Sequence, residues 1–235
     1  MNSLKWTIGD VEIFQITELD AGQLIQRSIK DATPENVQKI NWLYPHFADE
    51  AGNLKAQVSA FLLKSGNNNI LIDACNGNGK PRTDLPEWGD LQTDFLKRFR
   101  DTGITETDIN VVVSTHLHCD HVGWNTKLEG GIWVPTFPNA KYLFVKEEYE
   151  YWRQKPDKEM AADKLAFDDS VMPIVDAGLS KIIDADERID RNVSLLPTFG
   201  HTPGHVSVLI ESKGERAIIS GDFIHHPCQF AQPQW

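Results

Sequence analysis

The 235-residue sequence contains little cysteine, with only Cys75, Cys119 and Cys228. They are too few and too scattered for a disulfide framework or a CxxC metal site, so we expect three reduced thiols. No apolar run approaches the roughly 20 residues that span a bilayer. The first residues also lack the basic and apolar regions of a secretory signal. We therefore expect a cytoplasmic protein that does not associate with membranes.

Positively charged residues are also fewer than negatively charged ones. The sequence has 23 Lys and Arg residues against 34 Asp and Glu residues, and a formal net charge of −11. Such a chain repels a phosphate backbone, and no local basic patch offsets the average, so nucleic acid is excluded as a partner. A G-x-S-x-G motif is absent as well, which argues against a serine nucleophile on a strand-to-helix turn.

The remaining composition is that of a globular protein, with 40% hydrophobic and 24% charged residues, and the length suits a single domain over residues 1–235. Residues 20–57 form a long N-terminal excursion whose one helix signal is Thr33 before Pro34. Residues 156–186 look mostly helical and polar, like a lid-like insertion. The other predicted elements are strand pairs over 6–19 (turning at Gly9-Asp10) and 58–75, a helix over 90–103, a strand and helix over 140–152, and strands over 193–199, 205–212 and 216–222. This order favours a layered α/β architecture with mixed sheets.

The segment "STHLHCDH" (114–121) concentrates residues that can bind a metal directly after the apolar run "NVVV". Alternate residues of an extended segment project to the same side, so His116, His118 and Asp120 can converge on one point. His121 follows where the chain turns away. Neutral imidazoles and carboxylates suit Zn²⁺, and also Fe or Mn. The segment therefore predicts a metal site.

Two later segments place a polar residue at the end of a predicted strand. His201 stands in "FGHTPGH" (199–205), and Asp222 ends "IISGD" (218–222). In layered α/β proteins, sites are commonly built at the C-terminal ends of strands. Either residue alone is a weak signal, but beside the His116–His121 segment both become candidate ligands.

These motifs, together with "LIDAC" (71–75), resemble those of the metallo-β-lactamase-fold hydrolases, in the branch of lactonases and organophosphate-cleaving enzymes. The resemblance implies an α/β (α+β) fold, a four-layer αβ/βα sandwich of two mixed β-sheets with the site at their edge. It also implies two divalent metal ions, with zinc expected first and Mn or Fe as alternatives. By the family pattern, the first metal would be held by His116, His118 and His201, the second by Asp120 and His121, and Asp222 would bridge them.

The sequence departs from this family near its end. Members with two metals usually take a further histidine from a later strand, whereas this chain ends at Trp235, soon after Asp222. We expect that the final C-terminal strand and helix are lacking; the alternative is that His225 or His226 completes the second site. A missing outer layer would expose apolar sheet surface, which would favour a homodimer.

Residues near the motifs have competing interpretations. Asp73 in "LIDAC" matches a carboxylate that supports the ligands in the family, or is an ordinary turn residue. His205 is expected to be structural and Cys119 a packed thiol, because only the first histidine of the family's "HTPGH" binds metal and Cys119 has the opposite parity to the ligands. The aromatic residues Trp124, Trp133 and Phe137 would either line an apolar pocket or pack in the core.

The function that these residues imply is a metal-dependent hydrolase that opens a lactone or ester of a small molecule by attack of a metal-bridging hydroxide. Asp120 would receive the proton of the attacking water. His225 would contact a substrate oxygen, protonate the leaving group or orient a ligand, or would be purely structural. The alternatives are a phosphotriester hydrolase on the same site, a mononuclear iron oxygenase of the same fold acting on sulfur substrates, and a metal-binding scaffold without catalysis.

Overall fold

The computed structural model describes residues 4–235. Its strands are β1 (Leu4–Ile8), β2 (Val11–Asp20), β3 (Gln57–Ser65), β4 (Asn68–Ile72), β5 (Val111–Val113), β6 (Thr126–Glu129), β7 (Ile132–Pro135), β8 (Lys141–Val145), β9 (Ser180–Ile183), β10 (Val193–Pro197), β11 (Val206–Ser212) and β12 (Glu215–Ile219). Its α-helices are α1 (Gly22–Ser28), α2 (Pro34–Val37), α3 (Phe95–Arg100), α4 (Cys119–Val122), α5 (Lys146–Arg153), α6 (Ala161–Ala166), α7 (Met172–Asp176) and α8 (Cys228–Ala231). A π-helix, η5 (Phe167–Val171), joins α6 to α7. The short 3₁₀ turns are η1 (Asn41–Leu43), η2 (Pro86–Trp88), η3 (Glu106–Asp108), η4 (Gly123–Asn125) and η6 (Gly221–Phe223).

Seven strands form one large mixed sheet in the order β1-β2-β3-β4-β5-β8-β9. The pairs β1–β2 and β3–β4 are antiparallel, whereas β5 pairs in parallel with both β4 and β8. The two predicted hairpins are confirmed, the first with its turn at Gly9 and Asp10. Central β5 is apolar throughout because parallel strands are covered on both faces.

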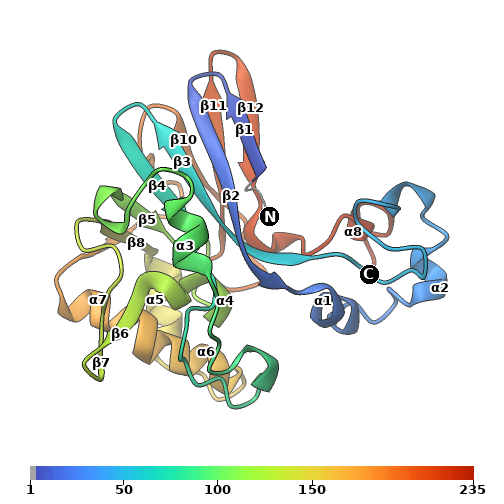
Figure 1. Ribbon diagram of the computed structural model, residues 1–235, viewed down its shortest axis with the longest axis horizontal. Helices are drawn as coiled ribbons and strands as arrows, with labels where there is room; N and C mark the ends of the chain where they lie inside the picture. Colours follow the sequence, from blue (N-terminus) through green and yellow to red (C-terminus); the bar gives the residue numbers. More distant parts are fainter. Residues whose placement is uncertain (1–3) are drawn as a thin grey trace. The chain divides into compact units, whose positions relative to one another are not determined.

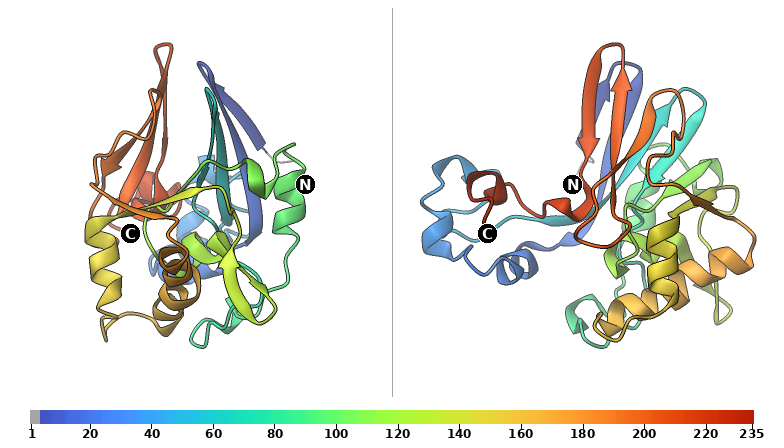
Figure 2. Two further views of the ribbon diagram at one scale, coloured as in Figure 1. Left: turned by 90° about the vertical axis from the view of Figure 1, so that its left-hand side faces the viewer. Right: turned by 180° about the vertical axis from the view of Figure 1, so that it is seen from behind.

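A smaller sheet of β10, β11 and β12 faces the large one, as the left view of Figure 2 shows, and both of its strand pairs are antiparallel. Aliphatic side chains fill the space between the sheets, among them Ile72 and Val113 from the large sheet and Val206 and Val208 from the small one. The predicted sandwich of two sheets is therefore confirmed. Within the described residues, only the larger sheet is mixed.

Helix α3 covers the outer face of the large sheet (Figure 1). Its Phe95 and Phe99 are fully buried. Phe95 stacks on Trp124 with 5.5 Å between ring centroids, and Phe99 contacts Phe137 at 5.6 Å. Of the two interpretations, pocket lining and core packing, the structure therefore supports core packing for Trp124 and Phe137. The helix is shorter than the predicted span of 90–103.

The prediction of a mostly helical segment over 156–186 is wrong in its last part. Helices α6, η5 and α7 occupy residues 161–176, but Ser180–Ile183 form β9, which pairs in parallel with β8 at the edge of the large sheet. An edge strand faces solvent along part of its length, and Ile182 is 42% exposed. Its short sequence "SKII" therefore carries little periodicity that could distinguish a strand from a helix.

The chain divides into two compact units. The first comprises Met1–Glu18 and Ser59–Phe223 and holds the three-stranded sheet, the two-stranded sheet of β6 and β7, and the large sheet except the ends of β2 and β3. The second comprises Leu19–Val58 and Ile224–Trp235. In the second unit, an apolar cluster that includes Val37, Leu43 and Cys228 joins the excursion to the C-terminal helix. Thr33 caps α2 by accepting a hydrogen bond from the Asn36 amide at 3.3 Å, as predicted. One domain over residues 1–235 stays a prediction.

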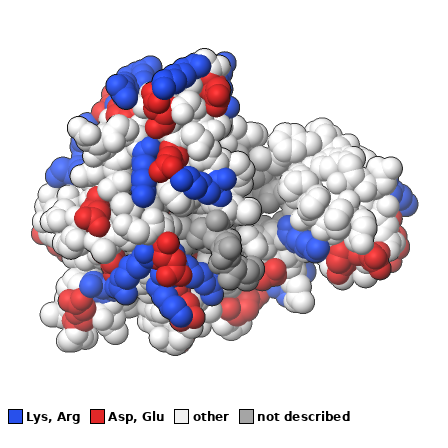
Figure 3. Space-filling model, turned by 45° about the horizontal axis from the view of Figure 1, so that its top comes forward, with Lys and Arg blue, Asp and Glu red and all other residues white. Residues whose placement is uncertain are grey.

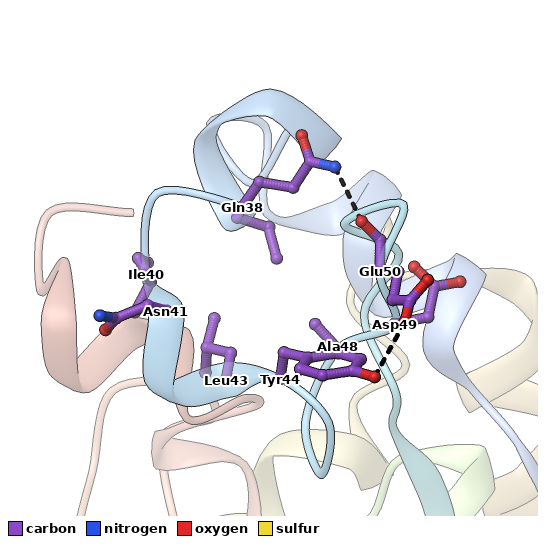
Figure 4. A pocket seen from close by; sticks show the side chains of 9 residues that line it. Gln38, Ile40, Asn41, Leu43, Tyr44, Ala48, Asp49 and Glu50 are labelled. Atoms are coloured by element: carbon purple, nitrogen blue, oxygen red, sulfur yellow. Dashed lines mark hydrogen bonds between the residues drawn. The ribbon is translucent and has the colours of Figure 1, made fainter.

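The second unit contains a pocket of about 330 Å³ (Figure 4). Apolar Ile40 and Leu43 line it together with polar side chains at its rim. There the Gln38 amide donates to the backbone oxygen of Glu50 at 2.8 Å, and the Tyr44 hydroxyl donates to the Glu50 carboxylate at 3.0 Å. These bonds hold the two sides of the loop together around the pocket.

The surface mixes both signs of charge on the face seen in Figure 3. Charged residues also form ion pairs with one another, such as Lys213 with Asp10 at 2.6 Å and Arg216 with Glu211 at 2.8 Å. Among residues 4–235, no helix has both the length and the apolar character needed to cross a membrane.

Candidate metal centre

The segment after β5 brings its two alternate histidines together. The extended segment expected for residues 114–120 is not observed: the chain bends at Thr115, His116 and His118, and Asp120 lies on α4, which begins at Cys119. The bent backbone nevertheless brings His116 and His118 together. Nε2 of His116 lies 3.0 Å from Nδ1 of His118. The His116 ring is completely buried, so its nitrogens have no access to bulk water.

His201 joins this pair from the loop between β10 and β11. Its Nε2 lies 3.0 Å from Nδ1 of His118, and one ring nitrogen from each of the three histidines lies within 4.8 Å of the others. Tetrahedral zinc with bonds of about 2.0–2.1 Å to nitrogen places its ligand atoms about 3.3 Å apart. The three imidazoles therefore fit a single divalent cation, as their chemistry and their spacing both indicate.

A second group forms on the other side of His116. Nε2 of His121 lies 3.5 Å from Oδ2 of Asp120 and 3.4 Å from Oδ1 of Asp222. The other oxygen of Asp222, Oδ2, lies 3.7 Å from Nε2 of His201. The two oxygens of Asp222 thus face the two groups, which is the arrangement required of a bridging ligand. All six residues predicted as ligands meet in one place.

The protonation of the centre reflects burial and mutual charge. Burial lowers the pKa of His118 and, aided by the neighbouring His121, holds the pKa of His116 well below its ordinary value. Burial also raises the pKa of Asp120. Burial acts to lower the pKa of His121, but the carboxylates of Asp120 and Asp222 outweigh it and raise that pKa well above its ordinary value. His116 and His118 therefore stand in the neutral form that binds metals, whereas the raised pKa of His121 favours its protonated form, so a cation that binds to His121 would release a proton.

Asp73 orients the candidate ligands through hydrogen bonds to Thr115 and His121. Its Oδ1 accepts the Thr115 amide at 2.7 Å, and its Oδ2 accepts both the Thr115 hydroxyl and Nδ1–H of His121 at 2.9 Å. Because that hydroxyl donates to Asp73, it accepts from Nδ1 of His116, 3.1 Å away. This hydrogen-bond network directs Nε2 of His116 and Nε2 of His121 at the centre, where His121 would offer a lone pair once its Nε2 proton is released. It also favours the supporting role for Asp73 over that of an ordinary turn residue.

His205 lies beside the centre with both ring nitrogens engaged. Its Nε2 accepts the backbone amide of Asp222 at 2.9 Å, and its Nδ1 lies 2.8 Å from the Thr198 hydroxyl. The intervening Gly221 has φ of +56°, and a Cβ there would lie 2.7 Å from Nε2 of His205. The geometry therefore agrees with a structural His205 and requires glycine immediately before Asp222.

Cys119 stands between two candidate ligands in the sequence and is itself buried. Its amide donates to Oδ1 of Asp163 at 2.9 Å, and burial raises the pKa of its thiol well above the ordinary value. Such a thiol is inert, in agreement with its interpretation as a packed side chain.

The two histidines considered as further ligands lie in the second unit. The His225 amide donates to Oε1 of Gln229 at 2.9 Å, and the role of its side chain in catalysis stays a prediction. Both ring nitrogens of His226 are engaged locally, Nδ1 by the Cys228 amide at 3.1 Å and Nε2 by the Phe47 carbonyl at 3.0 Å. His226 therefore has no ring nitrogen available for a metal.

Sequence reasoning did not single out Thr115 or Glu148, although both contact the ligand loops. Thr115 lies within the motif, directly before His116, but a threonine after a strand is too common to indicate a supporting role by itself. Glu148 lies on α5, far from the motifs in sequence, in the highly charged stretch "KEEYEYW". Only its burial, at 1% exposure, distinguishes it from its acidic neighbours.

Comparison with known families gives a match over most of the chain. The sequence model of the Metallo-beta-lactamase superfamily matches residues 55–233. An N-acyl homoserine lactonase of Bacillus cereus is 32% identical over 121 residues, which are 51% of this chain and 38% of that relative. The chain thus matches less than half the length of this curated relative.

Solved structures share the fold at low sequence identity. The crystal structure of the hydrolase AbOPH in the beta-lactamase superfamily has a TM-score of 0.73 and 24% identity, and the match covers 99% of this chain and 78% of that one. AidC, a dizinc quorum-quenching lactonase, has a TM-score of 0.63 and 21% identity, with 92% and 73% covered. At these identities the likeness shows the fold alone.

Proposed function

The chain belongs to the metallo-beta-lactamase superfamily, and on that premise we propose that it is a metal-dependent hydrolase that opens a small-molecule lactone or ester. The observation that carries the proposal is the convergence of His116, His118 and His201 within one group of donor atoms. Curated relatives that match half of the chain are N-acyl homoserine lactonases, which favours a lactone as the substrate.

The six converging residues would hold two divalent metal ions, with zinc proposed first. His116, His118 and His201 would hold one, Asp120 and His121 the other, and Asp222 would contact both. Divalent ions supply Lewis acidity when bound: they polarise a carbonyl oxygen and make water nucleophilic near neutral pH. The ring orientations set by Asp73 and Thr115 support this assignment because they direct Nε2 of His121 and of His116 at the centre.

Asp120 is proposed to accept the proton of the attacking water. Its carboxylate lies within the centre beside His121 and keeps 18% of its side-chain surface exposed, so that water can reach it. A carboxylate at this position is within reach of the proton that the reaction releases. The role of His225 toward the substrate belongs to the same proposal.

The experiment uses the full chain loaded with Zn²⁺ or Mn²⁺. Hydrolysis of an N-acyl homoserine lactone, an aryl ester and a phosphotriester is measured on one preparation, together with the metal content per chain. We expect lactone or ester turnover that a chelator abolishes and that His116→Ala removes. The control is His46→Ala, which changes an exposed histidine of the second unit.

Different outcomes separate the competing functions. Turnover of the phosphotriester in preference to the lactone would support that alternative on the same centre. One iron per chain with oxygen uptake would identify the oxygenase. Metal binding without turnover of any of the three substrates would contradict a hydrolase that opens lactones or esters.

A further inference from the structure

We propose that Glu148 is a positioning residue that holds the loops of His116, His118 and His201 together so that these three imidazoles can bind one metal. The inference rests on the proposed function for the identity of the centre, but it concerns a side chain that lies outside the ligand set and acts through backbone amides.

Three donors from three different segments meet on this one carboxylate. Oε1 of Glu148 accepts the Leu117 amide at 3.1 Å and Nε1–H of Trp152 at 2.7 Å. Oε2 accepts the Gly204 amide at 2.9 Å. All three donors are neutral, and the side chain is 1% exposed, so the hydrogen bonds replace water around a buried acid.

The Leu117 contact acts on the first two ligands. Leu117 stands between His116 and His118, and holding its amide toward α5 fixes the backbone from which both side chains project to the centre. Trp152, one turn after Glu148 on the same helix, lies edge-on to the His118 ring with 5.4 Å between centroids. The carboxylate thus orients both the backbone of this loop and the aromatic ring against which His118 rests.

The Gly204 contact acts on the third ligand. Gly204 lies three residues after His201 in the same loop, and this loop packs directly on α5: a Cβ at Gly204 would be 2.3 Å from the backbone nitrogen of Glu148. Only glycine permits this approach, so the close contact and the hydrogen bond to Oε2 have the same geometric origin. Glu148 therefore joins the loop of His201 to the loop of His116 and His118.

A carboxylate is required here because every partner is a donor. In glutamine, one oxygen becomes an NH₂ group, which donates and cannot accept. Glu148→Gln must therefore point its NH₂ either at the Gly204 amide or at the two donors on Oε1. Either orientation breaks the contact with one ligand loop while the volume of the side chain is nearly unchanged.

The test measures the affinity of the chelator-stripped protein for Co²⁺ by competition with a chromogenic chelator, together with the visible spectrum of bound Co²⁺. For Glu148→Gln we expect about 10- to 100-fold weaker binding, typical of residues that support metal ligands, and an altered spectrum. The matched control is Asp169→Asn, which changes a buried carboxylate that accepts from Arg82 and Ser170. We expect the control to lower the melting temperature while leaving affinity and spectrum at wild-type values.

Trp152→Phe provides a milder variant in case Glu148→Gln does not fold. It keeps an aromatic ring beside His118 but removes one of the three donors, so we expect a smaller loss of Co²⁺ affinity in the same direction. Gly204→Ala tests the contact between Glu148 and the His201 loop, because the added methyl group pushes this loop away from α5.

The outcomes separate this inference from the proposed function. Wild-type affinity and spectrum in Glu148→Gln, or in Trp152→Phe where Glu148→Gln does not fold, would overturn the positioning role while leaving the hydrolase intact. Weakened Co²⁺ binding in a chain that hydrolyses none of the substrates would uphold the role of Glu148 and refute the hydrolase. A wild-type chain that binds no Co²⁺ would overturn both.

Discussion

Lys80 is a buried cation whose charge should make the stability of the protein depend on pH in the alkaline range. It is 1% exposed, and its Nζ lies 2.8 Å from the Thr126 hydroxyl, 3.3 Å from Oδ1 of Asp169 and 3.6 Å from the centre of the Trp133 ring. Burial lowers its pKa from 10.5 to about 8; Asp169 opposes this change, and the neighbouring Arg82 adds to it. As the pH rises, the folded protein therefore loses this proton at a lower pH than the unfolded chain does.

The sign and the magnitude follow from the two pKa values. Between pH 8 and 10.5 the unfolded chain holds a proton that the folded chain has lost, so the free energy of unfolding rises with pH in this window. At 1.36 kcal/mol for each pH unit, the destabilisation present below pH 8 is about 3 kcal/mol, and it disappears by pH 10.5. Burial raises the pKa values of the thiols Cys75 and Cys119, which act in the opposite direction, so absolute stability is not the quantity to compare.

The assay is denaturant unfolding of the wild type and Lys80→Met at about pH 7.5 and about pH 10, at the two ends of this titration. The thiols are common to both proteins and cancel in the difference. Because this range covers only part of the titration, we expect the wild type to gain about 2 kcal/mol relative to Lys80→Met between the two pH values. A difference that stays constant with pH, or that changes in the opposite direction, would refute the account of Lys80.

Other predictions concern the centre, the core and the excursion. Asp73→Asn removes an acceptor from His121, so we expect about 10- to 100-fold weaker metal binding by chelator competition, and unchanged affinity would contradict the orienting role. Phe99→Ala empties a fully buried site under α3, so we expect a loss of about 3–5 kcal/mol in the free energy of unfolding; a loss below about 1 kcal/mol would show that the helix packs loosely. Thr33→Ala removes the cap of α2, so we expect faster amide exchange at Asn36, whereas unchanged exchange would show that the cap contributes little.

Local patterns predicted the parts of the fold in which the periodicity and the turn residues agree. The hairpin that turns at Gly9 and Asp10 is one example, and the strand and helix over 140–152 are another. The ligand segment was predictable from its concentration of His116, His118, Asp120 and His121 directly after a strand, although the extended geometry expected for it is wrong, because the segment bends and Asp120 lies on α4. The convergence of His201 and Asp222 on that segment came from the family resemblance, because local periodicity contains no information on distant contacts.

What the sequence could not predict depends on long-range pairing. Strand β9 is defined by its parallel partner β8, and its four residues have no pattern of their own. Glu148 belongs to an acidic stretch in which only the tertiary structure determines which glutamate is buried. The cluster of Lys80, Arg82 and Asp169 is likewise invisible in sequence, because charged residues are expected at the surface unless a partner compensates them.

The most direct test of the metal centre is anomalous X-ray diffraction from crystals of the zinc-loaded protein. Two peaks are expected, one bonded to His116, His118 and His201 and the other to Asp120 and His121, with Asp222 in contact with both. Zinc–ligand distances should be about 2.0–2.2 Å. The absence of any peak among these side chains, or the absence of a peak bonded to His201 together with His116 and His118, would contradict the account.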